Sequence, residues 1–444
     1  MPVPNPNPVR ITVIGAGYLG LTHAACMADL GHDVLALDVD QAKIDRMARG
    51  EAPFFEPGLE PMLQKSIDSG RLRFTTSYAE AGRFGELHFV CVGTPSAADG
   101  AADLSYVHAA VDSLAPHLES RCLIVGKSTV PVGTARALSS RIGQLAPAGS
   151  EAELAWNPEF LREGYAIQDS LLPDRLVFGV GSAWAEDLLR SVYAQPLAQG
   201  VPCLVMDLET AELVKVAANA FLATKISFVN AMAEVCEAVG ADVLPLAAAL
   251  GHDGRIGSRF LAPGLGFGGG CLPKDIRAFR STSLRLGLPS LATILGEVDA
   301  INMGRRARVV ELARSALGGS VAARRVAALG IAFKPDSDDV RDSASLDVCG
   351  RLAREGAVVS VHDPVATANA AVVEPSLTYS ANLMETVAGA DLVLHLTEWQ
   401  EYRAVDPAAL ALAVAEPKII DARCILDPGP WRAAGWSFQA VGRP

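Results

Sequence analysis

Cys271 is the residue of this sequence whose neighbours best suit nucleophilic chemistry. It follows the densest glycine cluster of the chain, the segment 263–270 (Pro-Gly-Leu-Gly-Phe-Gly-Gly-Gly). Pro273 suits the first turn of a helix, so the thiol is expected just before a helix N-terminus, where the helix dipole and Lys274 would favour the thiolate. Asp275 could face the same cleft and place a water or a proton, or only complement the helix dipole. The segment predicts covalent catalysis on a ligand held against the glycines, because an inert buried cysteine would explain neither the glycines nor the charges.

A second group of polar residues lies in the segment 208–239, which contains no glycine or proline and is apolar nearly all round. Such a pattern predicts a long buried helix. Lys215 and Asn219 are four residues apart in it and share one helical face. Burial lowers the pKa of a lysine, which would suit proton transfer at an alcohol. The alternative is a structural salt bridge between Lys215 and Glu212 or another carboxylate.

The segment that starts at Gly15 reads Gly-Ala-Gly-Tyr-Leu-Gly and has the GxGxxG pattern of a dinucleotide-binding turn. In this pattern Gly15 permits the tight turn, Gly17 lets the backbone approach a pyrophosphate, and Gly20 lets helix and strand pack closely. A predicted strand over 10–15 precedes the turn and a predicted helix over 18–30 follows it, which is the context that the pattern requires. The turn residues expected to bind the cofactor are Gly15, Gly17, Tyr18 and Gly20.

Asp38 ends the next predicted strand, 18 residues after Gly20. A carboxylate at this place accepts hydrogen bonds from the ribose hydroxyls of the adenosine and repels a 2′-phosphate, so the sequence predicts NAD and not NADP. Lys43 could pair with Asp38 or reach the ribose.

Strand and helix patterns alternate at both ends of the chain. In the first part, short apolar runs separated by helix-length segments cover 34–37, 87–92, 123–125, 154–156 and 176–180. After a helical region that ends near 317, candidate strands return at 326–332, 358–361, 392–396 and 419–420. The expected fold class is α/β, with two Rossmann-like, doubly wound domains joined by a long central helix and a helical region. The expected domains are 1–205, 206–318 and 319–444.

Composition limits the class of protein. The 444 residues carry a formal net charge of −12, which argues against nucleic acid or an anionic membrane as the main partner. The eight cysteines form no CxxC pair or Cys/His cluster, so no metal site is expected and the thiols are expected to be reduced. The Pro/Asn-rich tail 1–8 is no signal peptide, and no uninterrupted apolar run approaches the length of a membrane span. A cytoplasmic protein is therefore expected.

Further motifs connect these sites along the chain. They are the segments 15–21, 55–59 (Phe-Glu-Pro-Gly-Leu), 91–95, 128–134, 157–164, 215–228, 254–261, 264–275, 332–335, 338–341 and 397–399 (Thr-Glu-Trp). With these motifs in this order, the chain resembles the UDP-glucose/GDP-mannose dehydrogenase family along nearly its whole length. The segment 255–261 and the Thr-Glu-Trp triplet look more like the UDP-glucose branch than the GDP-mannose branch.

The resemblance implies a four-electron oxidation of UDP-glucose to UDP-glucuronate with two NAD, through a thiohemiacetal and a thioester on Cys271. It also implies a homodimer built on the long helix, which makes the helical region a dimerisation region. The same chemistry on GDP-mannose or a UDP-N-acetylhexosamine stays open, and so does a non-catalytic NAD-binding scaffold. A two-electron hydroxyacid dehydrogenase is a further alternative, but it would need neither Cys271 nor a second α/β domain.

The resemblance also assigns residue roles. The catalytic residues are Cys271 as nucleophile with Lys215, Asn219, Asp275, Thr129 and Glu159. Besides the turn, Asp38 and Lys43, the cofactor contacts are Thr94, Thr129, Glu163, Lys274 and Arg341. The substrate contacts are Phe160, Leu161, Arg162, Glu163, Lys215, Asn219, Phe260, Leu261, Ala262, Pro263, Gly264, Gly268 and Lys334. Arg255 would reach the substrate of the neighbouring subunit.

Three positions depart from the family pattern. Ala262 stands where an asparagine or another larger residue is usual, Gly270 where a serine usually precedes the cysteine, and Val216 where a tyrosine usually follows the lysine. None of these changes removes a group with an expected chemical role. Ala262 removes a possible hydrogen bond to the substrate, so the choice of sugar stays open.

Overall fold

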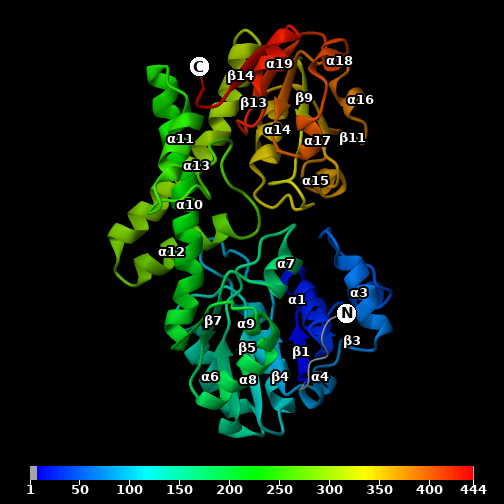
Figure 1. The fold of residues 1–444 in the computed structure, drawn as a ribbon, viewed down its shortest axis with the longest axis vertical. Coiled ribbons are helices and arrows are strands. Elements are labelled where there is room, and N and C mark those ends of the chain that lie inside the picture. Colours follow the sequence, from blue (N-terminus) through cyan, green and yellow to red (C-terminus); the bar gives the residue numbers. More distant parts are fainter. Residues whose placement is uncertain (1–7, 444) are drawn as a thin grey trace. The chain divides into compact units, whose positions relative to one another are not determined.

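A computed structural model describes residues 8–443 of the chain, so the expected nature of the N-terminal tail falls outside the described residues except for its last position. The chain divides into two compact units, Met1–Ala218 and Asn219–Pro444. The division falls inside one long helix, α10 (Leu208–Val239). The expected three-domain division stays a prediction, and each unit is described by itself below (Figure 1).

Unit 1 contains a doubly wound sheet with the strand order β3-β2-β1-β4-β5-β6-β7-β8. The strands are β1 (Arg10–Ile14), β2 (Asp33–Leu37), β3 (Leu72–Thr75), β4 (Leu87–Val90), β5 (Cys122–Gly126), β6 (Ala152–Trp156), β7 (Leu176–Gly179) and β8 (Cys203–Met206). All neighbours pair in parallel except β6 and β7, which meet antiparallel at Trp156 and Gly179. The order of the first six strands is that of a dinucleotide-binding Rossmann fold.

Helices cover both faces of this sheet, which is why its central strands are apolar on both sides. On β1, Ile11 and Val13 belong to one hydrophobic cluster and Ile14 belongs to another. Strand side chains alternate between faces, so β1 anchors both layers. The helices are α1 (Tyr18–Asp29), α2 (Gln41–Met47), α3 (Leu59–Asp68), α4 (Tyr78–Phe84), α5 (Ser105–Leu114), α6 (Thr134–Leu145), α7 (Ala166–Leu171), α8 (Ala183–Val192) and α9 (Ala194–Ala198).

Unit 2 contains a second sheet, with the strand order β11-β10-β9-β12-β13-β14 and parallel pairing throughout the described strands. The strands are β9 (Arg325–Leu329), β10 (Val358–His362), β11 (Thr378–Ser380), β12 (Leu392–His395), β13 (Lys418–Asp421) and β14 (Ser437–Ala440). Its helices are α14 (Ala344–Arg354), α15 (Thr367–Val373), α16 (Leu383–Val387), α17 (Gln400–Arg403), α18 (Pro407–Ala411) and α19 (Pro428–Ala433). In chain order this is again the Rossmann arrangement, so the expected pair of doubly wound sheets is confirmed.

The helical region of unit 2 combines the second half of α10 with α11 (Val243–His252), α12 (Leu272–Arg285) and α13 (Pro289–Ala316). α10 and α13 lie side by side (Figure 1), and the Ser227 hydroxyl donates a hydrogen bond of 2.7 Å to the Val298 carbonyl. Ala223 and Leu295 share a hydrophobic cluster between the two helices. The predicted bounds 208–239 of the long helix are those of α10.

The expectation that α10 is buried all round was wrong for the single chain. Phe221 is 67% exposed, Phe228 50% and Val239 71%, because residues 8–443 leave one face of the helix uncovered. The expectation about membrane spans concerned uninterrupted apolar runs, and α10 is interrupted by charged residues such as Lys215 and Lys225. With a mean hydropathy of 1.3, α10 is long and apolar enough to cross a membrane by length and composition alone, a test that core helices of globular proteins also pass.

Candidate active site

The GxGxxG turn between β1 and α1 has space for a ligand at one glycine only. Gly15 has a φ of 90°, which a side chain would strain. A Cβ on Gly20 would lie 1.7 Å from the Gly15 carbonyl oxygen, whereas a Cβ on Gly17 would meet no atom within 4 Å. The open backbone at Gly17, at the start of α1, therefore fits the pyrophosphate of a dinucleotide.

Asp38 follows β2 with capacity left for a ribose. Its side chain is largely buried and accepts two backbone N–H groups, from Ala16 at 3.0 Å and from Asp40 at 3.1 Å. An ionised carboxylate has about four acceptor positions, so about two remain for ribose hydroxyls. Lys43 is exposed in the first turn of α2, and no ion pair between its ammonium and Asp38 occurs in the described residues.

Thr94 and Thr129 follow the carboxyl ends of β4 and β5. Thr94 is buried and Thr129 half-buried. In open α/β sheets, ligands bind outside the carboxyl ends of the strands where the strand order reverses. Because the order reverses between β1 and β4, both threonines lie at the edge of the sheet where the cofactor is expected.

Lys215 on α10 forms an ion pair with Glu159, which follows β6. The distance between Lys215 Nζ and Glu159 Oε1 is 2.8 Å, and the two side chains are 5% and 12% exposed. Burial opposes ionisation of Glu159, but the Lys215 ammonium and the Leu161 N–H, which donates at 2.6 Å, together hold the pKa of Glu159 below its usual value. Two predicted catalytic residues therefore meet in unit 1, as a carboxylate with an ammonium.

Glu212, the partner considered for Lys215 in the sequence, has a different role. Its carboxylate accepts the N–H groups of Gly133 at 2.7 Å and Ala135 at 2.6 Å, at the start of α6. Burial raises the pKa of Glu212 to about 7, although these two backbone donors oppose the shift. The salt-bridge alternative was thus correct in kind, but the partner is Glu159.

The predicted substrate segment after β6 is held by neighbouring charges. Arg162 makes a two-pronged contact with Asp169, with distances of 2.9 Å from Nε and 2.7 Å from Nη2. The guanidinium of Arg175 lies 3.8 Å from the centroid of the Phe160 ring, and the Lys215 ammonium lies 5.6 Å from it. Phe160, Leu161 and Glu163 are each half-buried.

Cys271 is the exposed thiol among the eight free cysteines, and it is the N-cap residue of α12, as predicted. Burial raises the pKa of Cys91 to about 12, and the same cause raises the pKa of Cys122 to about 12. Those two thiols therefore stay protonated at neutral pH. An exposed thiol at a helix N-terminus is the one placed to react.

A polar cluster lies directly behind Cys271 in α12. Asp275 is 2% exposed and accepts a hydrogen bond of 2.6 Å from the Asn219 amide and one of 2.5 Å from the Lys274 ammonium. The Asp275 N–H in turn donates to the Cys271 carbonyl at 3.0 Å. Unit 2 therefore brings together four predicted residues, while the expected effect of Lys274 on the thiol stays a prediction.

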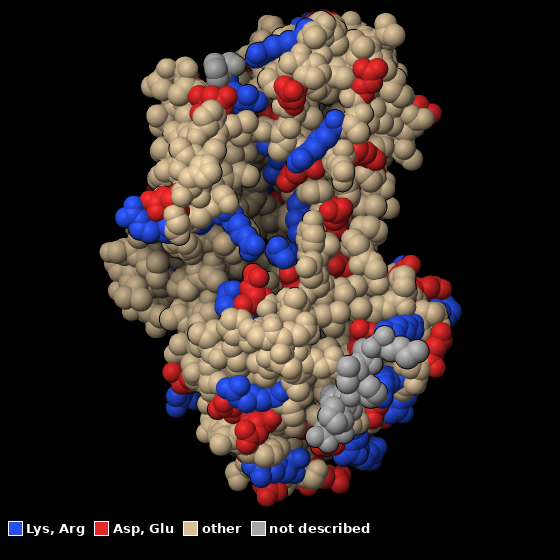
Figure 2. Space-filling view, in the orientation of Figure 1, with Lys and Arg blue, Asp and Glu red and all other residues tan. Residues whose placement is uncertain are grey.

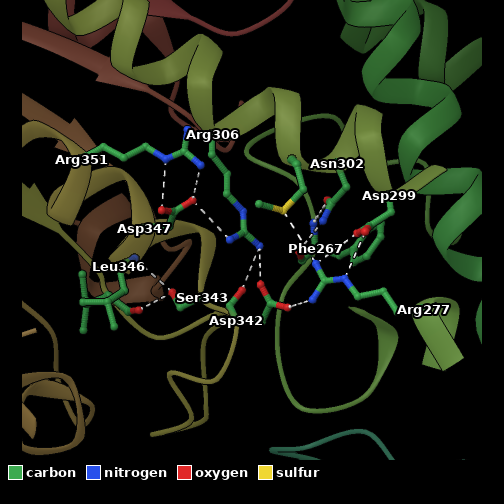
Figure 3. Close-up of polar contacts among 12 residues, drawn as sticks. Phe267, Arg277, Asp299, Asn302, Arg306, Asp342, Ser343, Leu346, Asp347 and Arg351 are labelled. Atoms are coloured by element: carbon green, nitrogen blue, oxygen red, sulfur yellow. Dashed lines mark hydrogen bonds and ion pairs between the residues drawn. The ribbon is translucent and has the colours of Figure 1, made fainter. Parts of the chain in front are cut away.

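Three residues that the sequence did not reveal as site residues fix the glycine loop before Cys271. The Asn302 side chain accepts from the Phe267 N–H at 2.8 Å and donates to the Phe267 carbonyl at 3.0 Å (Figure 3). Asn230 Oδ1 accepts the Gly264 N–H at 2.8 Å, and Arg305 Nε donates to the Gly264 carbonyl at 3.1 Å. Buried polar side chains on α10 and α13 thus replace the hydrogen bonds that a glycine-rich loop cannot make within itself.

An ion network ties α12 to the loop before α14. Arg277 contacts Asp299 at 3.0 Å and Asp342 at 2.8 Å, and Arg306 contacts the other oxygen of Asp342 at 2.8 Å (Figure 3). Arg306 is 3% exposed, so its pairing compensates for a buried charge. The network holds α12 against the segment that carries Lys334 and Arg341.

Gly270, which stands where the family usually has a serine, lies against the Arg341 side chain. A Cβ on Gly270 would lie 2.4 Å from the central guanidinium carbon of Arg341, and one on Gly268 would lie 2.5 Å from the Asp342 carbonyl oxygen. Arg341 also binds Asp339, with 2.6 Å between Nη2 and Oδ2. A serine at 270 would therefore have to displace the Arg341 side chain.

The remaining predicted substrate residues lie on the surface of unit 2 or just below it. Arg255 has a side chain 90% exposed and pairs with Asp253 at 2.7 Å. Phe260 has a φ of 63° and is 37% exposed, and Ala262 is exposed as well. Leu261, Pro263, Gly264 and Gly268 are buried, and Lys334 is half-buried, with its ammonium 5.6 Å from the centroid of the Phe333 ring.

On the face drawn in Figure 2, basic and acidic side chains are interspersed over each unit. Within residues 8–443, no group of three or more His, Cys, Asp or Glu side chains could hold a metal ion. A phosphate-bearing ligand would therefore be held by local donors such as the open turn at Gly17.

Models of one protein family match three consecutive parts of the chain. They are the NAD binding domain of the UDP-glucose/GDP-mannose dehydrogenase family over residues 9–197, its central domain over 209–304 and its UDP binding domain over 327–428. A UDP-glucose 6-dehydrogenase of Rhizobium meliloti is 40% identical over 439 residues, which cover 98% of this chain and 100% of that protein.

Solved structures agree with these matches. A UDP-glucose dehydrogenase from Pyrobaculum islandicum superposes with a TM-score of 0.91 at 38% identity, covering 100% of both chains. A UDP-D-ManNAc dehydrogenase from Pyrococcus horikoshii superposes with a TM-score of 0.85 at 25% identity, covering 98% of this chain and 99% of that one. The chain therefore belongs to the UDP-glucose/GDP-mannose dehydrogenase family, whose NAD-binding, central and UDP-binding domains it carries in that order.

Proposed function

We propose that this protein oxidises UDP-glucose to UDP-glucuronate, with NAD as hydride acceptor in two successive oxidations and Cys271 as covalent nucleophile. The observation that carries the proposal is the exposed Cys271 thiol at the N-terminus of α12, whose first turn also carries the buried Asp275, hydrogen-bonded to Asn219 and to the half-buried Lys274. The 40% identity to a UDP-glucose 6-dehydrogenase over nearly the full chain supports the substrate.

In the first oxidation, different residues bind the cofactor and remove the hydroxyl proton. The turn at Gly15, Gly17 and Gly20, with Asp38, holds NAD, which supplies the hydride acceptor when it is bound. Removal of a hydride from C6 of the sugar requires that the hydroxyl proton leave as well. The Lys215–Glu159 pair is the proposed path for this proton, through a water: the Glu159 carboxylate accepts the proton and then passes it on to solvent, which restores the ion pair.

Cys271 then adds to the aldehyde carbon. The new C–S bond converts the carbonyl into a thiohemiacetal, so the reactive aldehyde stays bound. Loss of a second hydride and of the hydroxyl proton gives a thioester. Lys215 and Asn219, one turn apart on α10, are the proposed donors to the oxygen that becomes negatively charged.

Water hydrolyses the thioester, which releases the carboxylate and returns the thiol. Asp275 and Glu159 are the two carboxylates proposed to orient this water, and Thr129 is the proposed hydroxyl partner. The balance is one sugar nucleotide, two NAD and one water consumed, with two NADH, the uronate and three protons formed. Hydrolysis of a thioester makes the sequence irreversible.

The test is the number of NADH molecules formed per molecule of UDP-glucose, for the wild type, Cys271→Ser and Cys203→Ser. Cys203 is a half-buried thiol on β8 and serves as the matched control. The proposal expects two NADH for the wild type and the control, and a block at or before the second oxidation for Cys271→Ser. One NADH per sugar, or full turnover by Cys271→Ser, would contradict the thioester route.

A second candidate is the same chemistry on another nucleotide sugar. Ala262 is exposed in the substrate loop and has no side-chain hydrogen-bonding group, so the loop sets the sugar less strictly than an asparagine would. A panel of UDP-glucose, UDP-N-acetylhexosamines and GDP-mannose separates the candidates by kcat/KM. Two NADH with another sugar and none with UDP-glucose would keep the mechanism and change the substrate.

We also propose a homodimer formed over the exposed face of α10. Phe221 and Phe228 are large apolar side chains at this face, 67% and 50% exposed, and faces of this kind mark interfaces. Light scattering after gel filtration tests this, with Phe221→Ser expected to shift the mass from two chains toward one. A wild-type monomer at micromolar concentration would contradict it.

A cytoplasmic location is part of the proposal, and cell fractionation tests it.

A further inference from the structure

The Phe-Glu-Pro-Gly-Leu segment 55–59 has no part in the proposed reaction, yet it contains a buried carboxylate. Glu56 is 6% exposed. Burying a carboxylate is costly unless hydrogen bonds compensate for the lost water. Its donors therefore indicate what the segment holds in place.

Three donors converge on Glu56. The Gly164 N–H donates to Oε2 at 2.7 Å and the Ala166 N–H donates to Oε1 at 2.7 Å. The Tyr18 hydroxyl donates to Oε2 as well, and it accepts from the Gly164 N–H at 3.0 Å. The burial of Tyr18 and its contact with Glu56 both raise the pKa of the phenol, so it stays a donor at every physiological pH.

These donors come from the dinucleotide turn and from the segment that follows β6. Tyr18 is the first residue of α1 and lies inside the GxGxxG turn itself. Gly164, with a φ of 78°, and Ala166 form the bend that leads into α7. Glu56 thus joins the dinucleotide turn to the segment that follows β6, and both lie at the carboxyl ends of strands of one sheet.

The residue between the fixed points is Glu163. On its N-terminal side, the Arg162 N–H and guanidinium are bound by Asp169, at 2.9 Å for the N–H. On its C-terminal side, the Gly164 N–H is bound by Glu56. The backbone of Glu163 is therefore held from both directions, at a place where the sequence predicted a cofactor contact.

We infer that Glu56 is a positioning residue for the cofactor: it holds the Tyr18 phenol and the 163–166 bend in the arrangement that receives NAD. The inference rests on the use of NAD at this turn and is independent of the sugar. Glu56 itself does not contact the reacting atoms. It acts through Tyr18 and the bend.

A carboxylate is needed because donors approach both of its oxygens. A glutamine at 56 has nearly the same shape but only one acceptor oxygen, so its NH₂ group would face at least one of the N–H donors. Leaving a buried donor without an acceptor typically costs about tenfold or more in an equilibrium constant. Glu56→Gln is therefore expected to raise the Kd for NAD about tenfold.

The test is isothermal titration of the full-length apo enzyme with NAD, in the absence of any sugar nucleotide. Glu60→Gln is the matched control, because Glu60 is an exposed glutamate four residues later, in the first turn of α3, that accepts one long hydrogen bond, 3.3 Å from the Ala52 N–H. The control is expected to leave the Kd unchanged. Tyr18→Phe is expected to weaken NAD binding less than Glu56→Gln, and the double variant less than the sum of both effects, because the two side chains share one hydrogen-bond network.

Each outcome decides the inference. An unchanged Kd for NAD in Glu56→Gln, with or without a lower melting temperature, would overturn it, and so would an equal loss in Glu60→Gln. If Glu56→Gln does not fold, Glu56→Asp decides instead: it keeps the charge but is one methylene too short for all three donors, and an unchanged Kd would overturn the inference. Because no sugar is present, failure of UDP-glucose as a substrate would leave this measurement intact.

Discussion

Removing the Lys215 ammonium tests whether the Lys215–Glu159 pair behaves as one buried unit. Both side chains are nearly inaccessible, at 5% and 12% exposure, and their charged atoms are 2.8 Å apart. Breaking a buried pair by removing one partner typically costs about 3–5 kcal/mol. In Lys215→Met, Glu159 keeps the Leu161 N–H as a donor at 2.6 Å, so the lower end, about 3 kcal/mol, is expected.

Glu159→Gln is expected to destabilise the protein for the mirrored reason, because it leaves the ammonium of Lys215 without its carboxylate. The double variant Lys215→Met/Glu159→Gln contains neither charge of this ion pair. Its loss of stability is therefore expected to fall short of the sum of the single losses by about 1–3 kcal/mol, a range typical of residues in direct contact.

The assay is urea unfolding followed by circular dichroism and by tryptophan fluorescence. Trp156 reports on this site because it is 2% exposed at the end of β6, three residues before Glu159. If the loss in the free energy of unfolding of the double variant equals the sum of the two single losses, the pairing is refuted.

The same variants predict a pH dependence. In the wild type, the folded pKa of Glu159 is lowered, so its contribution to stability is present above the unfolded value of about 4.3 and is lost as the pH falls through the folded pKa. In Lys215→Met, the Leu161 N–H and Lys127 still oppose the effect of burial, but the loss of the Lys215 ammonium raises the pKa of Glu159 relative to the wild type, so the variant regains stability relative to the wild type on acidification. A stability difference that stays constant between pH 5 and pH 8 would contradict this reasoning.

Three further predictions concern other parts of the chain. Gly17→Ala is expected to leave the melting temperature unchanged, because its Cβ meets no atom within 4 Å, but to weaken NAD binding at least tenfold in a titration. Gly20→Ala is expected to weaken NAD binding and also to lower the melting temperature, because its Cβ would lie 1.7 Å from the Gly15 carbonyl oxygen. Burial raises the pKa of Glu212 to about 7, so the wild type is expected to lose stability relative to Glu212→Gln as the pH rises from about 4.3 through 7, and parallel pH profiles of the urea midpoint would contradict this. Asn302→Ala is expected to lower kcat while NAD binding stays within about twofold, because it releases the Phe267 backbone before Cys271, whereas the dinucleotide turn belongs to unit 1.

Much of the architecture could be predicted because its signals are local. The two αβ alternations, the bounds of α10 and the N-cap position of Cys271 all follow from periodicity, glycine and proline. The edge strands β3, β8, β11 and β14 were not predicted, although short central strands such as β4 and β12 were, because the edge strands are only partly buried and give a weaker apolar signal. The apolar face of α10 was taken for a buried one because periodicity reports what is apolar and not which surface covers it.

The site could be predicted only where a residue carries its own chemical signal. Cys271, Lys215 and Asp275 do, whereas Asn302 and Glu56 act through backbone groups that only the folded chain brings to them. The same limit explains why the sequence named only Glu212, its neighbour on the helix, as a specific salt-bridge partner for Lys215. The partner in the folded chain, Glu159, lies 56 residues away in the sequence. Contacts across such separations are set by strand order, which no local pattern encodes.

The two sheets have the same strand order over six strands, but the carboxylates that follow β2 and β10 differ in the number of hydrogen-bond donors that they accept. In unit 2, Asp363 follows β10 as Asp38 follows β2 in unit 1, but its carboxylate accepts five donors where Asp38 accepts two. Those donors are Ile331, Ala332, Val365, Ala366 and the Trp399 indole. About four acceptor positions are thus filled at Asp363, while about two stay open at Asp38. The carboxylate after β10 is therefore not available as a ribose acceptor, although the two sheets share this strand order.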